Sequence, residues 1–170
     1  MPETPTTVQA LYRARPTVRL QGQENPRVRE LVVAMEMREQ EGGLSSLELR
    51  LTNVASLVGG AAELAFEADQ LLRLGDAIQI YAGDETSPRE IFRGKITGLE
   101  ADFPETDAPE LVVLAEDGLQ RGRMLRRTEV HPAGSIAAIV QRLAPRLGLN
   151  PVISGFTATI GPQVQLDERD

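Results

Sequence analysis

One histidine and a few clusters of charged side chains are the residues of this sequence that could carry chemistry. His131 precedes Pro132, and a nucleophilic triad would need a serine and an acid to converge on it. The sequence has no Gly-x-Ser-x-Gly motif, so we expect His131 to lie exposed in a loop and to take no part in catalysis. The absence of cysteine excludes thiolate zinc sites, cysteine nucleophiles and disulfides.

An acidic stretch and two glycine pairs are the other candidates for ligand binding. The acids are Asp102, Glu105, Asp107 and Glu110. They lack the Asp-x-Asp-x-Asp-Gly spacing of a calcium loop and its final bidentate glutamate. Gly59-Gly60 is not followed by the lysine and Ser/Thr of a phosphate-binding loop, and Gly118 to Gly122 do not follow the dinucleotide-binding pattern. We therefore expect a solvated acidic loop, and no metal site, cofactor or catalytic residue.

The only basic cluster of the sequence follows this acidic stretch. It consists of Arg121, Arg123, Arg126 and Arg127. One interpretation is a contact with phosphate or with an acidic partner. The alternative is a strand whose arginines pair with nearby Asp and Glu side chains. The formal net charge of −7, from 25 acids and 18 bases, favours this alternative and disfavours specific binding of nucleic acid.

Alternating apolar residues predict the elements that must position these side chains. Six strands are expected, at residues 10–20, 31–38, 47–52, 77–82, 90–99 and 111–115. The Gly42-Gly43 turn joins the second and third into a β-hairpin, while residues 21–29 form a connection. Gly94 and Gly98 share one face of the fifth strand, which predicts strong bending or close backbone approach. Residues 54–74 are compatible with a short helix or an ordered long loop, and the whole indicates a closed or nearly closed antiparallel barrel.

Helical spacing replaces this alternation after residue 130. Ser135 can cap a helix whose apolar stripe is Ile136, Ile139, Val140, Leu143 and Leu147. Pro145 predicts that the helix ends near residue 144 or kinks, and Gly148 can cap its end. The expected fold is mainly β: a loose N-terminal arm (residues 1–9), the barrel (10–130), and a helix that opens a second, incomplete α/β domain (131–170).

The order of several short segments is more specific than any one of them. The segments are GGLSSLEL (42–49), LGDAIQIY (74–81), IFRGKIT (91–97), PELVVLAED (109–117), LRRT (125–128) and SIAAIV (135–140). Over about residues 10–148 this succession resembles the N-terminal part of phage late control D proteins. These are baseplate hub proteins of contractile tails, related to the VgrG hub of type VI secretion and to hubs of extracellular contractile injection systems. The strongest matches are the Phe-x-Gly-x-Ile-Thr strand and the strand that ends in Ala-x-Asp.

This resemblance implies a first barrel built like a tail-tube subunit, followed by a smaller α/β domain and a second barrel. Three copies then adapt a six-fold tube to a three-fold spike. The implied partners are other copies of the chain in a trimer, the tail tube protein, the spike protein and other baseplate proteins. The chain departs from this pattern because it stops soon after the helix, without a second barrel, and because Pro145 interrupts that helix. A fragment, a split hub and a hub whose remainder lies on another polypeptide are all compatible with this length.

The expected function is therefore structural, as a hub or tube-initiating component of a contractile tail or injection system. With no signal peptide at Met1 and no run of 18 apolar residues, we expect synthesis in the bacterial cytoplasm, no membrane insertion, and a place in a phage tail or injection particle. The predicted subunit contact comprises Val58, Leu64, Phe66 and Leu72, with ordinary core packing as the alternative. Two rival functions are a stand-alone ligand-binding barrel, which the few aromatic residues disfavour, and a tail-associated hydrolase, for which no motif places two carboxylates.

Overall fold

The computed structural model describes residues 15–56, 62–66, 71–84, 86–124 and 127–166, so the predicted N-terminal arm lies outside the described residues. Contacts within the chain divide it into two compact units, Met1–Asp117 and Gly118–Asp170. The division precedes the expected boundary between residues 130 and 131. That expected boundary would cut through strand β10 (Glu129–His131), which pairs with β13 (Gln163–Gln165) inside the second unit.

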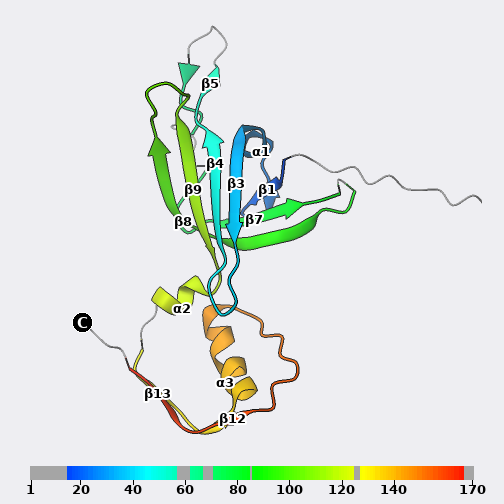
Figure 1. Ribbon diagram of the computed structural model, residues 1–170, viewed down its shortest axis with the longest axis vertical. Helices are drawn as coiled ribbons and strands as arrows, with labels where there is room; N and C mark the ends of the chain where they lie inside the picture. Colours follow the sequence, from blue (N-terminus) through cyan, green and yellow to red (C-terminus); the bar gives the residue numbers. More distant parts are fainter. Residues whose placement is uncertain (1–14, 57–61, 67–70, 85, 125–126, 167–170) are drawn as a thin grey trace, which may run out of the picture. The chain divides into compact units, whose positions relative to one another are not determined.

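The first unit is built on one seven-stranded antiparallel sheet (Figure 1). Its strands, in spatial order, are β2 (Gln23–Glu24), β1 (Thr17–Leu20), β7 (Ala77–Ala82), β8 (Arg89–Asp102), β9 (Glu110–Asp117), β4 (Ser46–Thr52) and β3 (Val32–Arg38). Within the described residues β2 and β3 pair on one side only, so the hydrogen-bonded strands form an open sheet. The structure thus confirms a large antiparallel sheet, and its closure into the expected closed or nearly closed barrel stays a prediction.

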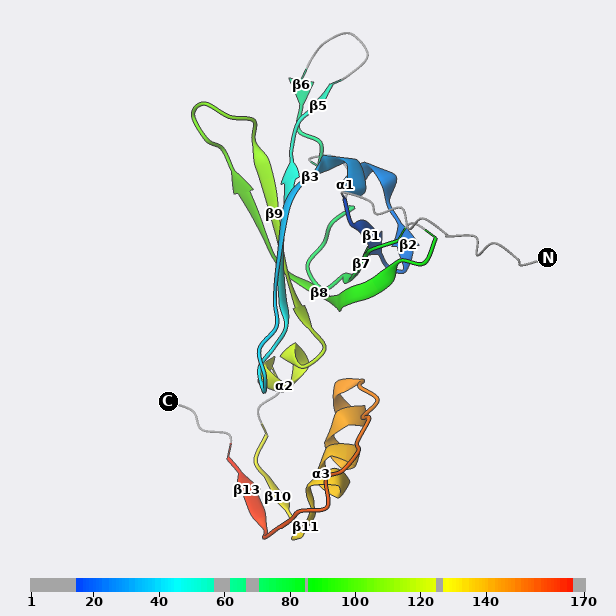
Figure 2. The ribbon, with the colours of Figure 1, turned by 45° about the vertical axis from the view of Figure 1, so that its right-hand side comes forward.

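Strand β8 connects two differently oriented parts of this sheet (Figure 2). Its first half pairs with β7 and its second half pairs with β9, and Gly94 belongs to both pairings, opposite Ile78 and Asp117. A Cβ atom at Gly94 would lie 2.2 Å from the carbonyl oxygen of Glu116. The predicted close backbone approach is confirmed here, because only glycine leaves room for the two strands.

The core covers one face of the sheet and follows the predicted alternation closely in the central strands. Its largest side chains with almost no exposure are Leu47, Leu49 and Leu51 of β4, Ile78 and Ile80 of β7, Ile96 of β8, and Val18, Val28 and Val113. Each inward residue is followed by one that is only half-buried, as in the pattern of β4. The period-two spacing therefore predicts the core of this unit well.

The predicted hairpin is confirmed as β3 and β4, which pair from Val32↔Leu51 to Arg38↔Ser46. A β-bulge between Val32 and Ala34 shifts the alternation of β3 at its start. As a result Val32 is buried while Val33 is 56% exposed. Strict alternation along residues 31–38 would place Val33 on the same face as Met35, and the extra residue of the bulge explains the difference.

The expected connection at residues 21–29 instead contains β2 and a helix, α1 (Pro26–Leu31). Asn25 caps this helix, because its Oδ1 accepts a hydrogen bond from the backbone N–H of Val28 at 3.1 Å. Pro26 stands at the first helical position, where its missing N–H costs no hydrogen bond. Val28 is fully buried in the core, so α1 packs against the sheet with its short apolar side.

The described part of residues 54–74 contains a small hairpin of β5 (Ala55–Ser56) and β6 (Ala62–Glu63) and turns, but no helix. Asn53, directly before this segment, is buried and binds the turn at Ala65 and Phe66. Its Oδ1 accepts from the backbone N–H of Phe66 at 3.1 Å, and its carbonyl accepts from Ala65 N–H. Between the two expectations for this segment, the ordered loop describes it better.

The second unit contains short helices and strands, of which α3 is the longest. They are α2 (Gln120–Met124), β10, β11 (Gly134–Ser135), α3 (Ile136–Leu143), the 3₁₀ helix η1 (Ala144–Leu147), β12 (Thr159–Ile160) and β13. The Ser135 cap is confirmed, since its Oγ accepts from the N–H of Ala138 at 3.1 Å. The α-helix ends at Leu143 and η1 begins at Ala144, directly before Pro145, as predicted; Gly148 ends η1 with a positive φ of 73°. No helix among the described residues is long and apolar enough to cross a membrane.

Candidate functional site

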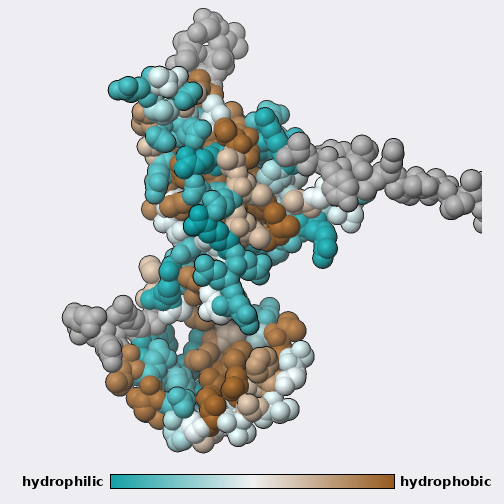
Figure 3. Space-filling view, in the orientation of Figure 1, coloured by the Kyte–Doolittle hydropathy of each residue, from teal (hydrophilic) through white to brown (hydrophobic). Residues whose placement is uncertain are grey.

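Strand β3 forms one edge of the sheet, with no strand paired to its outer side among the residues that the structure describes. An edge strand leaves a row of backbone N–H and C=O groups unpaired, which a further strand can use. An open groove of about 680 Å³ runs beside the start of β3. Its lining comprises Arg15, Pro16, Glu30, Thr52 and the continuous stretch from Leu31 to Met35. Figure 3 shows apolar surface over β3, so the edge combines free backbone groups with apolar side chains.

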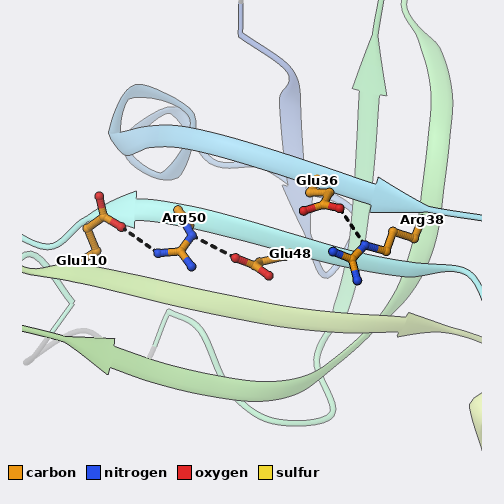
Figure 4. Close-up of polar contacts among 5 residues, drawn as sticks. All are labelled: Glu36, Arg38, Glu48, Arg50 and Glu110. Atoms are coloured by element: carbon orange, nitrogen blue, oxygen red, sulfur yellow. Dashed lines mark hydrogen bonds and ion pairs between the residues drawn. The ribbon is translucent and has the colours of Figure 1, made fainter.

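A ladder of charged side chains covers the solvent-facing side of β3, β4 and β9 (Figure 4). Arg38 donates to Glu36 at 2.6 Å, and Arg50 donates to both Glu48 at 2.9 Å and Glu110 at 3.3 Å. Glu36 and Glu48 face one another directly across the two strands. Two like charges in that position repel, and the arginine beside each carboxylate offsets this repulsion.

Hydrogen bonds within this ladder shift the pKa values of its side chains. The Arg38 guanidinium donates to Glu36 and holds the pKa of that carboxyl below its ordinary value. The pKa of Arg50 is raised, first by its hydrogen bond to Glu48 and then by that to Glu110. These groups are well solvated, so the ladder contributes little to stability. The ladder places acidic and basic side chains next to one another on β3 and β4, beside the edge of the sheet.

A second polar cluster lies on β7 and β8, around Glu90. The Glu90 carboxylate accepts from Arg93 at 2.7 and 2.6 Å, from the Tyr81 hydroxyl at 2.7 Å and from Gln79 at 3.1 Å. The hydrogen bond from Arg93 lowers the pKa of Glu90, partial burial opposes this, and Tyr81 adds to the lowering. Arg19 stacks over the Tyr81 ring, 4.4 Å from its centroid. A carboxylate with this many donors is poorly suited to act as a general acid.

The predicted subunit contact is only partly brought together. Phe66 and Leu72 are half-buried and pack against the core of their own unit. The Arg27 guanidinium lies 5.9 Å from the centroid of the Phe66 ring and also donates to the carbonyl of Ala65. Leu64 is half-buried, and Val58 lies outside the described residues. The contacts of Phe66 and Leu72 favour the core-packing alternative for these two, and a subunit contact at Leu64 stays a prediction.

The arginine cluster lies at the start of the second unit, on α2 and after it, and not on a strand. Arg121 donates from Nη1 to the backbone carbonyl of Leu147 at 3.1 Å, which ties α2 to η1. Arg123 and Arg127 are exposed, and Arg126 lies outside the described residues. The strand expected in the alternative interpretation is therefore replaced by a short helix and a coil.

His131 differs most from its expectation, because it is 5% exposed and belongs to β10. Arg142 Nη2 lies 2.8 Å from its Nδ1, and Gln165 Oε1 lies 3.5 Å from its Nε2. A guanidinium can only donate, so Nδ1 accepts and the proton of the neutral ring sits on Nε2. Both partners are far from His131 in the sequence, which is why the residue types near it did not predict its burial. Among the described residues no group of three His, Asp or Glu side chains could hold a metal ion.

No protein-family model matches the chain, and no curated protein matches it either. The resemblance to hub proteins therefore rests on the order of short sequence segments. The free β3 edge, its apolar groove and the charge ladder beside it are the surface on which a function can be argued.

Proposed function

We propose that the chain is a structural component of a contractile phage tail or injection system, a hub or tube-initiating subunit that adapts a tail tube to a spike. The free β3 edge with its apolar groove carries this proposal. A subunit that assembles through β-strands needs an accessible edge, whereas an isolated soluble domain benefits from blocking it. The resemblance in segment order supports the same function.

We further propose that the sheet of the first unit is a tail-tube-like barrel left open between its two edges, the β2–β1 side and β3. The lining of the groove includes Arg15 and Pro16, which directly precede β1, and residues of β3, and this supports an opening between those two parts of the chain. Helix α1 and its buried Val28 fill the interior behind it. The second unit, with its helix and short strands, would open the smaller α/β domain. Partners would be further copies in a trimer, the tail tube protein, the spike and other baseplate proteins, within the particle.

The interior of the sheet favours this structural function over a ligand-binding barrel. Leu49, Ile78 and Ile80 have no exposed surface and occupy the place where a ligand would have to sit. The Glu90 carboxylate, held by Arg93 and Tyr81, likewise offers little support for a two-carboxylate hydrolase.

The test is the solution mass of the chain, by light scattering, alone and after mixing with a tail tube or spike protein of the same particle. The variant Val33→Lys places a charge on the exposed start of the edge, where a side chain that is already 56% exposed should not affect folding. Phe103→Lys is the matched control, because Phe103 is 63% exposed on the same unit and lies outside β3. We expect association of the parent and of Phe103→Lys, and its loss in Val33→Lys. A parent that stays monomeric with both partners, or equal association of the two variants, would contradict the proposal.

A further inference from the structure

The two units carry opposite charge, which the net charge of the whole chain conceals. The sequence up to Asp117 has 21 acidic and 11 basic residues, whereas the sequence from Gly118 onward has 4 acidic and 7 basic residues. The described residues of the second unit include five arginines and a single carboxylate, that of Glu129. A domain with this charge attracts acidic ligands at short range.

A small pocket of the second unit lies among these arginines. It has a volume of about 190 Å³ and an apolar part made by Leu143 and Leu147. The remaining lining residues are Gly122, Arg127, Glu129, Arg146 and Gln165. Pockets for whole small-molecule ligands usually measure about 300–1,000 Å³. The size of this one suits a single apolar side chain of a larger partner.

The two arginines of the pocket differ in their partners. Arg146 Nη1 donates to Glu129 Oε2 at 2.5 Å, and this hydrogen bond lowers the pKa of Glu129. Arg127 is exposed and makes no hydrogen bond or ion pair within the described residues. Arg127 can therefore bind a carboxylate from outside without giving up an internal contact, and a guanidinium binds a carboxylate in a two-point geometry.

We propose that this pocket binds an acidic segment of a partner protein, with an apolar side chain between Leu143 and Leu147 and an adjacent carboxylate on Arg127. The apolar lining and the free guanidinium together distinguish this ligand from nucleic acid. A nucleic-acid site would use stacking aromatic rings beside the arginines, and no aromatic residue is among the lining residues of the pocket. The proposal concerns the second unit alone and does not depend on the assembly function of the β3 edge.

The test uses the full chain and fluorescence anisotropy with labelled peptides. The probe is a peptide with a central leucine flanked by aspartates and glutamates, and its matched control has asparagines and glutamines in their place. Arg127→Ala should weaken binding of the acidic peptide about tenfold or more, since a hydrogen bond to a charged group is lost. Arg123→Ala removes the same charge from the same unit outside the pocket, and should leave the affinity nearly unchanged.

Two further variants separate a binding effect from a folding effect. Glu129→Gln removes the partner of Arg146 and one negative charge, so affinity for the acidic peptide should rise a fewfold, which unfolding cannot produce. Gly122→Met should fill the pocket, because a Cβ atom at Gly122 has its nearest neighbour, Leu147 Cδ1, at 3.8 Å. This variant keeps every charge and should abolish binding.

Several outcomes would overturn the proposal. With the parent chain, these are a failure of the acidic peptide to bind, equal binding of the acidic and neutral peptides, or tighter binding of a single-stranded oligonucleotide than of the acidic peptide. With the variants, they are equal losses of affinity in Arg127→Ala and Arg123→Ala, or unchanged affinity in Gly122→Met. Thermal melting of each variant shows whether it is folded under the conditions of the measurement.

Discussion

Replacement of Gly94 by alanine should destabilise the first unit more than any other single-methyl addition to β8. The added Cβ would meet Glu116 O at 2.2 Å, Glu116 C at 2.8 Å and the Phe92 ring at 2.8 Å. Overpacking costs about 1–3 kcal/mol where side chains can move aside. Here the obstacle is the backbone of β9, which is fixed by its pairing with β4 on the other side. We therefore expect a loss of about 3 kcal/mol or more, out of a total of about 5–15 kcal/mol for a domain.

Gly98→Ala is the matched control, because it adds the same methyl group to the same strand. Its new Cβ would meet only the Leu114 side chain, with Cδ1 at 3.1 Å and Cβ at 3.3 Å. A leucine side chain can shift by a few tenths of an ångström, so the expected cost is about 1 kcal/mol or less. The two variants differ only in whether backbone or side chain stands in the way.

The assay is urea unfolding followed by circular dichroism, with the chain and both variants at equal concentration. With a slope of about 1–3 kcal/mol per molar urea, the loss predicted for Gly94→Ala lowers the midpoint by at least about 1 M. Gly98→Ala should lower it by a much smaller amount. If the two variants have the same urea midpoint, or if the midpoint of Gly94→Ala equals that of the parent, the close approach of β8 and β9 does not govern the stability of this sheet.

Two other predictions concern buried and charged hydrogen bonds. Asn53→Ala should lower the free energy of unfolding by about 1–3 kcal/mol, because the N–H of Phe66 loses its acceptor, and urea unfolding against the exposed control Thr106→Ala measures this. Glu90 has a lowered pKa in the folded state, so its contribution to stability is fully present above the ordinary pKa of a glutamate and is lost as the pH falls through the lower folded pKa. When the pH is lowered from neutral to acid, the free energy of unfolding should therefore fall less in Glu90→Gln than in the parent. Parallel plots of this free energy against pH for the two proteins would refute the prediction.

Local patterns predict the central strands of this fold but not its edges. Leu47, Leu49 and Leu51 alternate with polar residues, and each is buried as that period requires. At Val33 the same reasoning fails, because a bulge inserts a residue and a one-residue shift moves side chains to the other face. Whether β3 pairs with β1 depends on the curvature of the sheet and on the position of α1. Neither can be predicted from the spacing of apolar residues in the sequence.

Some of what was missed had a readable signal. Asn25 followed by Pro26 combines an N-cap residue with a proline at the first helical position, which together predict the start of α1. The helix has only six residues, less than two turns, so its apolar periodicity is too short to identify it. His131 had no comparable signal, because its burial depends on Arg142 and Gln165, which only the folded second unit brings to it.

The charge of the whole chain is a poor guide to what its arginines bind. Ionic screening at physiological salt confines the effect of a charge to about 8 Å, so a pocket responds to its lining and near neighbours and not to the sum over the sequence. That lining contains Arg127, Arg146 and Glu129, with Glu129 already engaged by Arg146. The net charge of −7 disfavoured an acidic partner for the arginine cluster, yet the excess of acids lies entirely before Gly118. The charge of the pocket lining therefore favours the acidic ligand that the charge of the whole chain disfavours.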